Sequence, residues 1–598
     1  MTLPDAGCRQ LLDAARRWAD RDPDPVTTAA LRGLMALSRG DGPASLQAKL
    51  ELADSFAGTL QFGTAGLRAA LGPGPNRMNR VVVRRAAAGL AAFLRDTAAG
   101  RYTPRAVVGY DARHNSDVFA AETAAIFTAA GIETYLLPAA LPTPLLAYAV
   151  RRLGCEGGVM VTASHNPPQD NGYKVYLGGR AVPEAARGSQ IVAPYDEQIA
   201  ARIAAAGELE SIRLAPSGWT VVDTSSGLGG HDDDGTRDLV TGYVKAVCAL
   251  ADPVRFPGRD LKIVLTPMHG VGGETAVSVL KGAGFSDVTL VTAQAMPDPD
   301  FPTVSFPNPE EPGALDLALE TARRTGADIV LANDPDADRA AAAAVDPSTG
   351  AWRMLRGDEV GALLGAHLVA RLAAPAGDSA SGSASRGVFA NSIVSSRLLA
   401  RIAGANGFDH EQTLTGFKWI SRVPGLVYGY EEALGYAVAP DLVRDKDGIS
   451  AALLIAELAA TAKAAGKTVF DTLDELSLVH GLHATDQLSV RVADLGLLEA
   501  MMNRLREHAP TVFGGSAVEY VVDLAEGSES LPPTEGLLYL TQDRSRVIIR
   551  PSGTEPKLKC YLEVIIPVGL PADLPEAKDR ARAALDAVLQ DVRAALGL

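Results

Sequence analysis

The chain has 598 residues and a formal net charge of −15, with 71 acidic side chains against 56 Lys and Arg. This acidic balance argues against the basic patch or stripe that a nucleic-acid-binding protein normally carries, so we expect no nucleic-acid partner. The length exceeds what one hydrophobic core usually holds and predicts roughly four domains. A small anionic ligand can still bind through local Arg and Lys side chains.

The cysteines and the N-terminus define the expected setting. The four cysteines lie far apart and form no Cys-x-x-Cys pair, which indicates neither a disulfide framework nor a zinc site. The first residues lack a basic region followed by an apolar core, and no uninterrupted apolar stretch has the length of a membrane span. We therefore expect a soluble protein of the cytoplasm without a membrane partner.

Short apolar runs alternate with Ala-rich helical stretches along most of the chain. Continuous apolar runs of this length are typical of strands that helices cover on both faces. The expected strands are Ala106–Tyr110, Glu133–Leu137, Gly158–Val161, Lys262–Leu265, Val288–Val291, Asp328–Leu331 and Gly387–Ala390. The alternation predicts an α/β fold.

Two polar segments and one change of pattern indicate the domain organisation. Residues 223–235 are polar and Gly-rich, and residues 373–386 form a low-complexity loop that we interpret as an exposed insertion. After about residue 480 the strands become alternating, as in Leu488–Val492 and Arg546–Arg550, which favours a separate α+β domain. The expected domains are 1–205, which includes an N-terminal helical extension, 206–345, 346–480 and 481–598.

A serine lies just beyond the predicted strand Gly158–Val161. The segment Thr162–Pro167 contains Ser164 and His165, and it leads towards Lys174. A serine at the end of a strand, with His and Lys nearby, is placed to act as a nucleophile. The Gly-x-Ser-x-Gly signature of many acyl-transfer enzymes is absent.

Three carboxylates follow the predicted strand Asp328–Leu331. Asp334, Asp336 and Asp338 occupy every second position, and Arg339 comes next. Carboxylate oxygens suit a hard cation such as Mg²⁺. A serine combined with such a metal loop indicates phosphate chemistry rather than acyl transfer.

Two more loops carry polar groups of a recognisable kind. Gly429–Tyr436 places paired acids beside aromatic residues, and carboxylates accept hydrogen bonds from the vicinal hydroxyls of a sugar. Arg550–Lys557 presents Arg, Ser, Thr and Lys around a glycine. That set offers backbone N–H groups, hydroxyls and two cations to a tetrahedral dianion, so we interpret it as a phosphate cradle.

The four loops, in this order, resemble those of the α-D-phosphohexomutase superfamily, most closely its phosphoglucomutase/phosphopentomutase branch. The resemblance runs from Gly63–Arg68 to Lys557 and so covers most of the chain. It implies three α/β domains with mixed sheets and a C-terminal α+β domain around a central cleft. It also implies that a phosphoserine gives its phosphoryl group to a sugar monophosphate, and that the enzyme takes back the other phosphoryl group of the resulting bisphosphate.

The resemblance further implies roles for individual residues. Phosphorylated Ser164 would bind Mg²⁺ together with Asp334, Asp336 and Asp338, while His165 and Lys174 would exchange a proton with the sugar hydroxyl. Substrate contacts are implied for Arg68, Arg113, Arg339, Lys418, Glu431, Arg550, Ser552, Gly553, Thr554 and Lys557. A sugar bisphosphate such as glucose 1,6-bisphosphate would be the activator, and we expect a monomer or a homodimer.

Each motif alone has a simpler interpretation. A Ser-His pair is often a turn or a helix cap, Asp338 with Arg339 is often a solvated ion pair, and Ser552–Thr554 is compatible with a plain turn. Caps and turns do not predict one another across hundreds of residues, so their joint occurrence favours function. Gly270–Gly273 lacks the spacing of a dinucleotide loop, and we interpret it as a tight strand-to-helix turn.

The identity of the sugar stays open. This chain has Glu431, Glu432 and Ala433 where the better-known phosphoglucomutases, as the resemblance suggests, have Glu-Glu-Ser. Phosphoglucomutase is the first expectation, and phosphomannomutase or phosphopentomutase is the alternative. A metal-dependent sugar phosphatase would have no use for the second phosphate cradle, and a non-catalytic sensor would be expected to lose the serine or the carboxylates.

Overall fold

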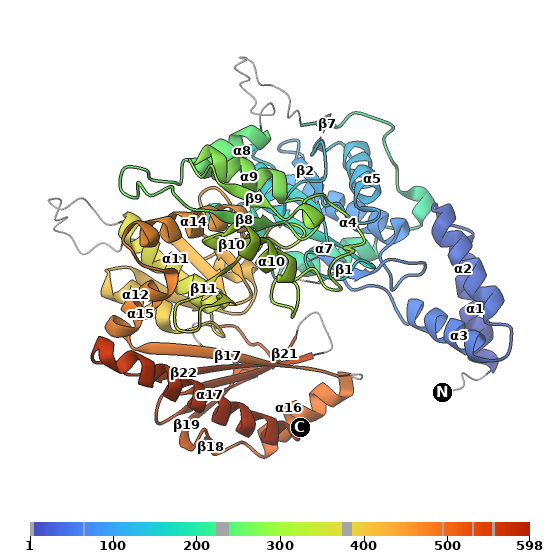
Figure 1. The fold of residues 1–598 in the computed structure, drawn as a ribbon. Helices are drawn as coiled ribbons and strands as arrows, with labels where there is room; N and C mark the ends of the chain where they lie inside the picture. Colours follow the sequence, from blue (N-terminus) through green and yellow to red (C-terminus); the bar gives the residue numbers. More distant parts are fainter. Residues whose placement is uncertain are drawn as a thin grey trace, which may run out of the picture. The chain divides into compact units, whose positions relative to one another are not determined.

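Figure 1 shows the fold in a computed structural model that describes residues 5–63, 66–222, 239–372, 386–492, 495–528, 531–552 and 557–598. The predicted linker 223–235 lies outside the described residues, and so does the predicted insertion 373–386 apart from Arg386. The chain forms two compact units. The first contains Met1–Val254, Arg259–Ala343 and Gly435–Ala456, and the second contains Arg255–Gly258, Ala344–Leu434 and Glu457–Leu598.

The first unit contains most of the helices. They are α1 (Asp5–Ala19), α2 (Pro25–Leu37), α3 (Pro43–Ser55), α4 (Arg80–Ala98), α5 (Ser116–Ala129), α6 (Thr143–Arg152), α7 (Tyr195–Ala204), α8 (Leu239–Cys248), α9 (Gly273–Gly282), α10 (Asp316–Thr325) and the first half of α14 (Gly448–Ala464). Its strands are β1 (Leu67–Ala70), β2 (Arg105–Tyr110), β3 (Glu133–Leu136), β4 (Gly157–Val161), β5 (Asp170–Leu177), β6 (Ser189–Gln190), β7 (Thr220–Val221), β8 (Ile263–Thr266), β9 (Val288–Leu290), β10 (Ile329–Ala332), the start of β11 (Ala341–Asp346) and β16 (Gly435–Ala437). Short 3-10 helices lie at Glu184–Ala186, Leu209–Ser211 and Thr292–Gln294.

Helices α1 to α3 form an N-terminal extension, drawn in blue in Figure 1. Helix α2 begins after Asp24, whose carboxylate accepts the N–H of Val26, and Pro25 occupies the first turn, where its missing N–H costs nothing. The buried side chains of the extension form a small apolar cluster. Trp18 packs against this cluster and against the core of the adjoining α/β layer, so the extension is joined to that core by apolar contact.

The larger sheet of the first unit has the order β1-β5-β4-β2-β3-β7, and β6 pairs with β5. Strands β2, β3, β4 and β7 are parallel, whereas β5 is antiparallel to β4, β1 and β6. Every residue of β4 is buried, as expected for a strand that is covered on both faces. Strand β4 ends at Val161 and β5 begins at Asp170, so the serine segment forms the connection between two paired strands.

The second sheet of this unit places the acidic loop. Strand β10 is parallel to β8 and antiparallel to β11, and β8 is parallel to β9. Asp334, Asp336 and Asp338 lie between the end of β10 and the start of β11. The predicted strand-to-helix turn at Gly270–Gly273 is confirmed between β8 and α9, and a Cβ on Gly270 would lie 2.4 Å from Pro335 of the acidic loop. Only glycine permits this close approach.

The second unit contains two further layers of helices and strands. Its helices are α11 (Gly357–Leu372), α12 (Leu398–Ala405), α13 (Phe417–Ile420), α15 (Val469–His480), α16 (Leu495–Glu507) and α17 (Leu574–Leu596), with 3-10 helices at Leu524–Glu526 and Pro571–Asp573. Its strands are β12 (Ala351–Met354), β13 (Val388–Ser392), β14 (Asp409–Thr413), β15 (Leu426–Glu431), β17 (Leu482–Arg491), β18 (Val512–Phe513), β19 (Ser516–Asp523), β20 (Leu537–Thr541), β21 (Arg546–Pro551) and β22 (Lys557–Ile566).

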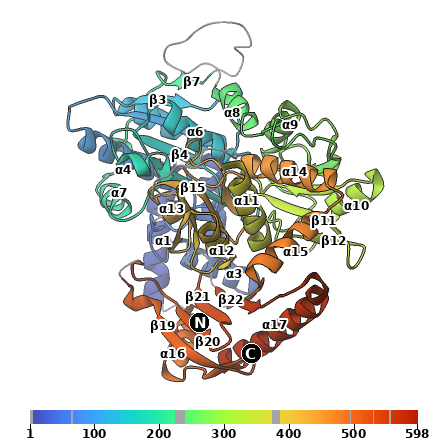
Figure 2. The same cartoon turned by 90° about the vertical axis from the view of Figure 1, so that its left-hand side faces the viewer.

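Strands β14, β13 and β15 are parallel, as in an α/β layer. The C-terminal strands instead form an antiparallel sheet with the order β17-β22-β21-β20-β19-β18. Helices α16 and α17 pack on this sheet and share an apolar core with it (Figure 2). The predicted fold class, α/β with mixed sheets followed by an α+β domain, is confirmed.

The predicted strands are present. Most of them begin and end within two residues of the expected positions, but β17 begins at Leu482 rather than Leu488. Its early residues are half-buried and alternate only weakly, which is why the pattern missed them. The four-domain boundaries at 205, 345 and 480 stay a prediction.

Among the described residues, we find no single helix that is both long and apolar enough to cross a membrane. Helices α14 and α15 together have a sufficient length and composition, but they are bent by 88° at the break between them.

Gly172 in β5 gives a stability test of the serine connection. A Cβ at this position would lie 2.5 Å from the carbonyl oxygen of Thr162 and 2.9 Å from that of Leu67, and neither backbone atom can move without disturbing the sheet. Gly172→Ala should therefore lose about 1–3 kcal/mol of stability, measured as a lower unfolding temperature. The control is Gly33→Ala in α2, where an added Cβ meets nothing within 4 Å. Equal unfolding temperatures for the two variants would contradict this account.

Candidate active site

The serine segment has a strained and buried backbone. Ser164 is 2% exposed and adopts a φ of 53°, which a residue other than glycine rarely does outside functional sites. The hydroxyl oxygen of Thr162 accepts the N–H of Ser164 at 2.9 Å, and the same hydroxyl donates to Asp111 at 2.6 Å. The left-handed backbone at Ser164 is thus held by side chains around it.

Arg113 lies beneath this segment. Its Nη2 donates to the carbonyl oxygens of Ser164 and Asn166, both at 2.5 Å, and its Nη1 donates to those of Pro167 and Asp170 at 2.8 and 3.1 Å. Its Nε lies 3.3 Å from Asp111 Oδ2. These contacts give Arg113 a positioning role in the loop, and its substrate contact stays a prediction.

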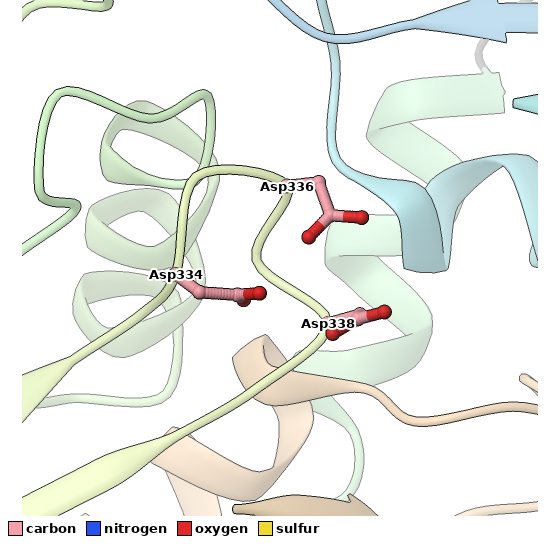
Figure 3. A group of neighbouring side chains, drawn as sticks. All are labelled: Asp334, Asp336 and Asp338. Carbon is pink, nitrogen blue, oxygen red and sulfur yellow. The ribbon is translucent and has the colours of Figure 1, made fainter. Parts of the chain in front are cut away.

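Ser164 and the acidic loop meet directly. Ser164 Oγ donates to Asp334 Oδ2 at 2.8 Å, although the two residues are 170 positions apart. Asp334, Asp336 and Asp338 are all buried on one loop (Figure 3), and each offers a carboxylate oxygen within 4.8 Å of the others. The two motifs that the sequence analysis combined therefore form a single site.

Cations surround the three carboxylates. Lys174 Nζ lies 2.7 Å from Asp336 Oδ2 and 2.8 Å from Asp338 Oδ2, and Lys446 Nζ lies 3.4 Å from Asp338 Oδ2. Burial alone would lower the pKa of Lys174, but these two carboxylates outweigh it and raise the pKa above its ordinary value. In this arrangement the two carboxylates hold Lys174 as an ammonium group.

The residues present fit a hard cation. Among the residues that the structure describes, Asp336 Oδ1 and Asp338 Oδ1 are buried oxygens without a hydrogen-bond partner. Such atoms are costly unless a cation or another donor reaches them. Burial, together with the charges of Asp336 and Asp338, raises the pKa of Asp334 well above its ordinary value, and a divalent cation would reverse that effect.

Three more predicted residues lie around Ser164. His165 Nδ1 is 3.2 Å from Ser164 Oγ. Arg68 Nη1 donates to Asn166 Oδ1 at 3.2 Å. Arg339 Nε lies 3.8 Å from both Asp334 and Asp338, and the Arg339 backbone N–H donates to Asp334 at 3.0 Å. All three are parts of the same polar cluster as the serine.

Two contributors to this cluster were missed by the sequence analysis. Lys446 precedes α14 in an Arg-Asp-Lys-Asp-Gly run, and Thr143 at the start of α6 donates to Asp336 Oδ2 at 2.7 Å. The charged run before an apolar helix was a usable signal for Lys446. Thr143 carried none, because only the fold brings it to the acidic loop.

The remaining predicted residues belong to the second unit. Glu431 is the last residue of β15, and its neighbour Glu432 accepts hydrogen bonds from Ser392 and Ser395, each at 2.9 Å. Lys418 lies in α13 and contacts the ring of Trp419. Arg550 lies in β21, and Ser552 is the first residue after this strand. The Ser552 N–H donates to the carbonyl oxygen of Lys557 at 2.8 Å. Gly553 and Thr554 lie outside the described residues.

Comparison with protein families identifies four consecutive modules. Residues 59–206, 241–346 and 356–477 match α/β/α domains I, II and III of phosphoglucomutase/phosphomannomutase, and residues 490–565 match the C-terminal domain of that family. The helices of the N-terminal extension precede the first match.

Individual relatives agree with these matches. The chain is 43% identical over 488 residues to a protein of Haemophilus influenzae named "Probable phosphomannomutase", covering 81% of this chain and 93% of the relative. It is 34% identical over 589 residues to the phosphopentomutase of Homo sapiens, covering 92% and 91%. The crystal structure of a Paramecium phosphoglucomutase, parafusin, has the same fold, with a TM-score of 0.66 at 20% identity over 91% of this chain and 96% of that one. This chain therefore belongs to the phosphoglucomutase/phosphomannomutase family and is a mutase-type phosphotransferase of sugar phosphates.

Proposed function

We propose that this enzyme moves a phosphoryl group between the C1 and the C6 or C5 hydroxyl of an aldose phosphate, through phosphorylated Ser164 and a sugar bisphosphate. The contact that carries the proposal is the 2.8 Å hydrogen bond between Ser164 Oγ and Asp334, within the cluster of three buried carboxylates. A nucleophile beside a cation site suits phosphoryl transfer, in which an enzyme contributes mainly positioning and charge neutralisation.

Each transfer breaks one P–O bond and forms another. In the forward step the P–O bond to Ser164 breaks, a P–O bond to the sugar hydroxyl forms, and the hydroxyl proton leaves. His165, with Nδ1 at 3.2 Å from Ser164 Oγ, is placed to exchange this proton, and Lys174, whose Nζ lies 2.7 Å from Asp336 Oδ2 in the same cluster, is the second candidate for that exchange. The reverse step restores the phosphoserine with the other phosphoryl group of the bisphosphate.

Asp334, Asp336 and Asp338, with the phosphoryl oxygens on Ser164, would hold Mg²⁺. When bound, the ion acts as a Lewis acid on the phosphoryl group. Arg68 and Arg339 lie in the same polar cluster, which suits them for contact with the anionic substrate.

The remaining predicted residues are proposed to bind the substrate. Glu431 and Lys418 would contact the sugar. The non-reacting phosphate would bind to Arg550, Ser552, Gly553, Thr554 and Lys557, because a planar guanidinium and hydroxyls match a tetrahedral dianion. Glucose 1,6-bisphosphate is the proposed activator, since it can phosphorylate Ser164 directly.

The proposed sugar preference is broad. The family description and the named relatives cover glucose, mannose and pentose phosphates. In the loop Gly429–Tyr436, called the sugar loop below, Ala433 lacks the hydroxyl that the better-known phosphoglucomutases, as the resemblance suggests, have at this point. One missing hydrogen bond changes discrimination by only a small factor. We propose that glucose 1-phosphate is a substrate and that mannose and pentose 1-phosphates are accepted as well.

Ser164 should carry the phosphoryl group. After incubation with glucose 1,6-bisphosphate, intact-mass analysis should show a phosphorylated fraction, which disappears in Ser164→Ala because the acceptor oxygen is gone. The control is Ser348→Ala at an exposed turn, which should keep the phosphorylated fraction. Full mutase turnover in Ser164→Ala would exclude the phosphoserine.

Asp336 should be needed for the metal. Asp336→Asn keeps an oxygen for the Thr143 hydroxyl but removes a charge from the cation site, so kcat should fall roughly 100-fold or more. Titration calorimetry should show weaker Mn²⁺ binding, while Asp346→Asn in β11 serves as the unaffected control. A chelator-treated enzyme that keeps its rate without added metal would remove the metal from the mechanism.

Ala433 should influence the choice of sugar. Ala433→Ser restores one hydroxyl and should raise kcat/KM for glucose 1-phosphate relative to ribose 1-phosphate by about 2- to 10-fold, the effect of one hydrogen bond. Rates on glucose, mannose, ribose and deoxyribose 1-phosphates are measured side by side. Ala433→Cys adds an atom of similar size with a poor hydrogen-bonding group and should leave the ratio unchanged. The same ratio in all three proteins would remove position 433 from sugar selection.

A further inference from the structure

A buried carboxylate that no motif contains lies at the centre of the second unit. Glu563 in β22 is 1% exposed. Its Oε1 accepts hydrogen bonds from the Ser396 hydroxyl and the Arg397 N–H, both at 2.8 Å, and lies 3.1 Å from His483 Nδ1. Its Oε2 accepts the Arg397 Nε–H at 2.6 Å and lies 3.2 Å from Arg546 Nη2. One side chain thus connects β17, β21 and β22 to the segment that follows β13.

Arg546 reinforces the same connection. Its side chain is buried, and it donates through Nη1 to the carbonyl of Ile393 at 2.9 Å and through Nη2 to that of Ser395 at 2.6 Å. Burial alone would raise the pKa of Glu563, but the charges of Arg546 and Arg397 and the hydrogen bond from His483 hold the pKa well below its ordinary value. Glu563 and Arg546 are therefore ionised at neutral pH. From the C-terminal sheet, they make hydrogen bonds to the backbone of the segment Ile393–Arg397.

The segment Ser392–Arg397 also makes hydrogen bonds to the sugar loop. Ser392 and Ser395 donate to Glu432 Oε2 at 2.9 Å each, and the Glu432 N–H donates back to the Ser395 hydroxyl at 3.1 Å. Asp358 accepts both the Ser396 N–H at 2.7 Å and the Tyr430 hydroxyl at 2.9 Å. The residues on either side of Glu431 are thus fixed to the segment that Glu563 and Arg546 hold.

The same strand carries the phosphate cradle. Arg546 and Arg550 both lie in β21, four residues apart, so their side chains lie on the same face of the sheet. Strand β22 pairs Glu563 with Arg546 and Lys559 with Arg550. The anchor of the sugar loop and the proposed phosphate ligand therefore share one strand pair.

We propose that Glu563 and Arg546 are positioning residues that hold the sugar loop at Glu431 and the phosphate cradle at Arg550 in one fixed arrangement. This inference rests on the proposed function. A mutase must bind its substrate in two orientations, and a fixed spacing between the sugar hydroxyls and the non-reacting phosphate lets one surface serve both. Because these contacts act on bound substrate in the ground and transition states alike, their loss should raise KM more than it lowers kcat.

The first variant is Glu563→Gln, which keeps the shape of the side chain but turns an amide NH₂ towards a donor. KM for glucose 1-phosphate should rise about 10-fold or more, while kcat should change less than about 3-fold because the groups around Ser164 are untouched. Hydrogen exchange should become faster in peptides that cover 392–397 and 426–434. Arg546→Lys serves as the second variant if Glu563→Gln folds poorly. It keeps a positive charge beside Glu563 but loses the two-pronged hydrogen bonding of the guanidinium, so KM should again rise more than kcat falls, by a smaller factor.

The matched control is Glu122→Gln in the first unit, where a buried glutamate bridges Arg80 and Arg84. It should lose stability as Glu563→Gln does, but KM and the exchange of 426–434 should not change. The double variant Glu563→Gln with Glu432→Gln should have about the KM of the more impaired single variant, because both substitutions break one connected path.

The outcomes separate the inference from the function on which it rests. An unchanged KM in Glu563→Gln and Arg546→Lys, with a wild type that turns over normally, overturns the positioning role alone. If KM in the double variant rises by the product of the two single-variant increases, the positioning role is overturned as well. A wild type without mutase turnover overturns the proposed function and this inference together.

Discussion

The active site of the first unit depends on three buried carboxylates, those of Asp334, Asp336 and Asp338. One oxygen of each lies within 4.8 Å of the others. Burial and mutual repulsion both disfavour such a cluster, so it persists only where cations and donors surround it. Lys174 comes from β5, Lys446 from the segment before α14, and Thr143 from the start of α6. The acidic loop therefore ties together three elements that lie far apart in the chain.

The strain at Ser164 follows from the same constraint. For its hydroxyl to reach Asp334, the backbone between β4 and β5 adopts a left-handed conformation at a non-glycine residue. Arg113 donates hydrogen bonds to four carbonyl oxygens of this segment, and the Thr162 hydroxyl oxygen accepts the N–H of Ser164. The conformation costs free energy locally, and this set of buried hydrogen bonds offsets that cost.

Sequence reasoning found the parts of the site that are local in the chain. Ser164 and the three aspartates stand directly after apolar strands, and both features can be recognised within about ten residues. The contacts of Thr143, Arg113 and Glu563 depend on which elements the fold brings together, so no short pattern contains them. Arg113 was identified as a cation of the site, but nothing in the sequence indicated that its guanidinium also donates to four carbonyl oxygens of the serine segment and lies beside Asp111 and Phe301. The strands were predictable wherever they are apolar on both faces, and β17 was found only in part because its first residues are half-buried.

Transfer of a labelled phosphoryl group tests the central claim most directly. Enzyme labelled with isotopic phosphate on Ser164 is freed of bisphosphate and mixed with unlabelled glucose 1-phosphate, and the label is followed through the first turnover. The account predicts that the label leaves the protein, passes through a glucose bisphosphate and ends in glucose 6-phosphate, because the enzyme takes back the other, unlabelled phosphoryl group. Release of the label as inorganic phosphate, or its retention on the protein while mutase turnover continues, would contradict the account.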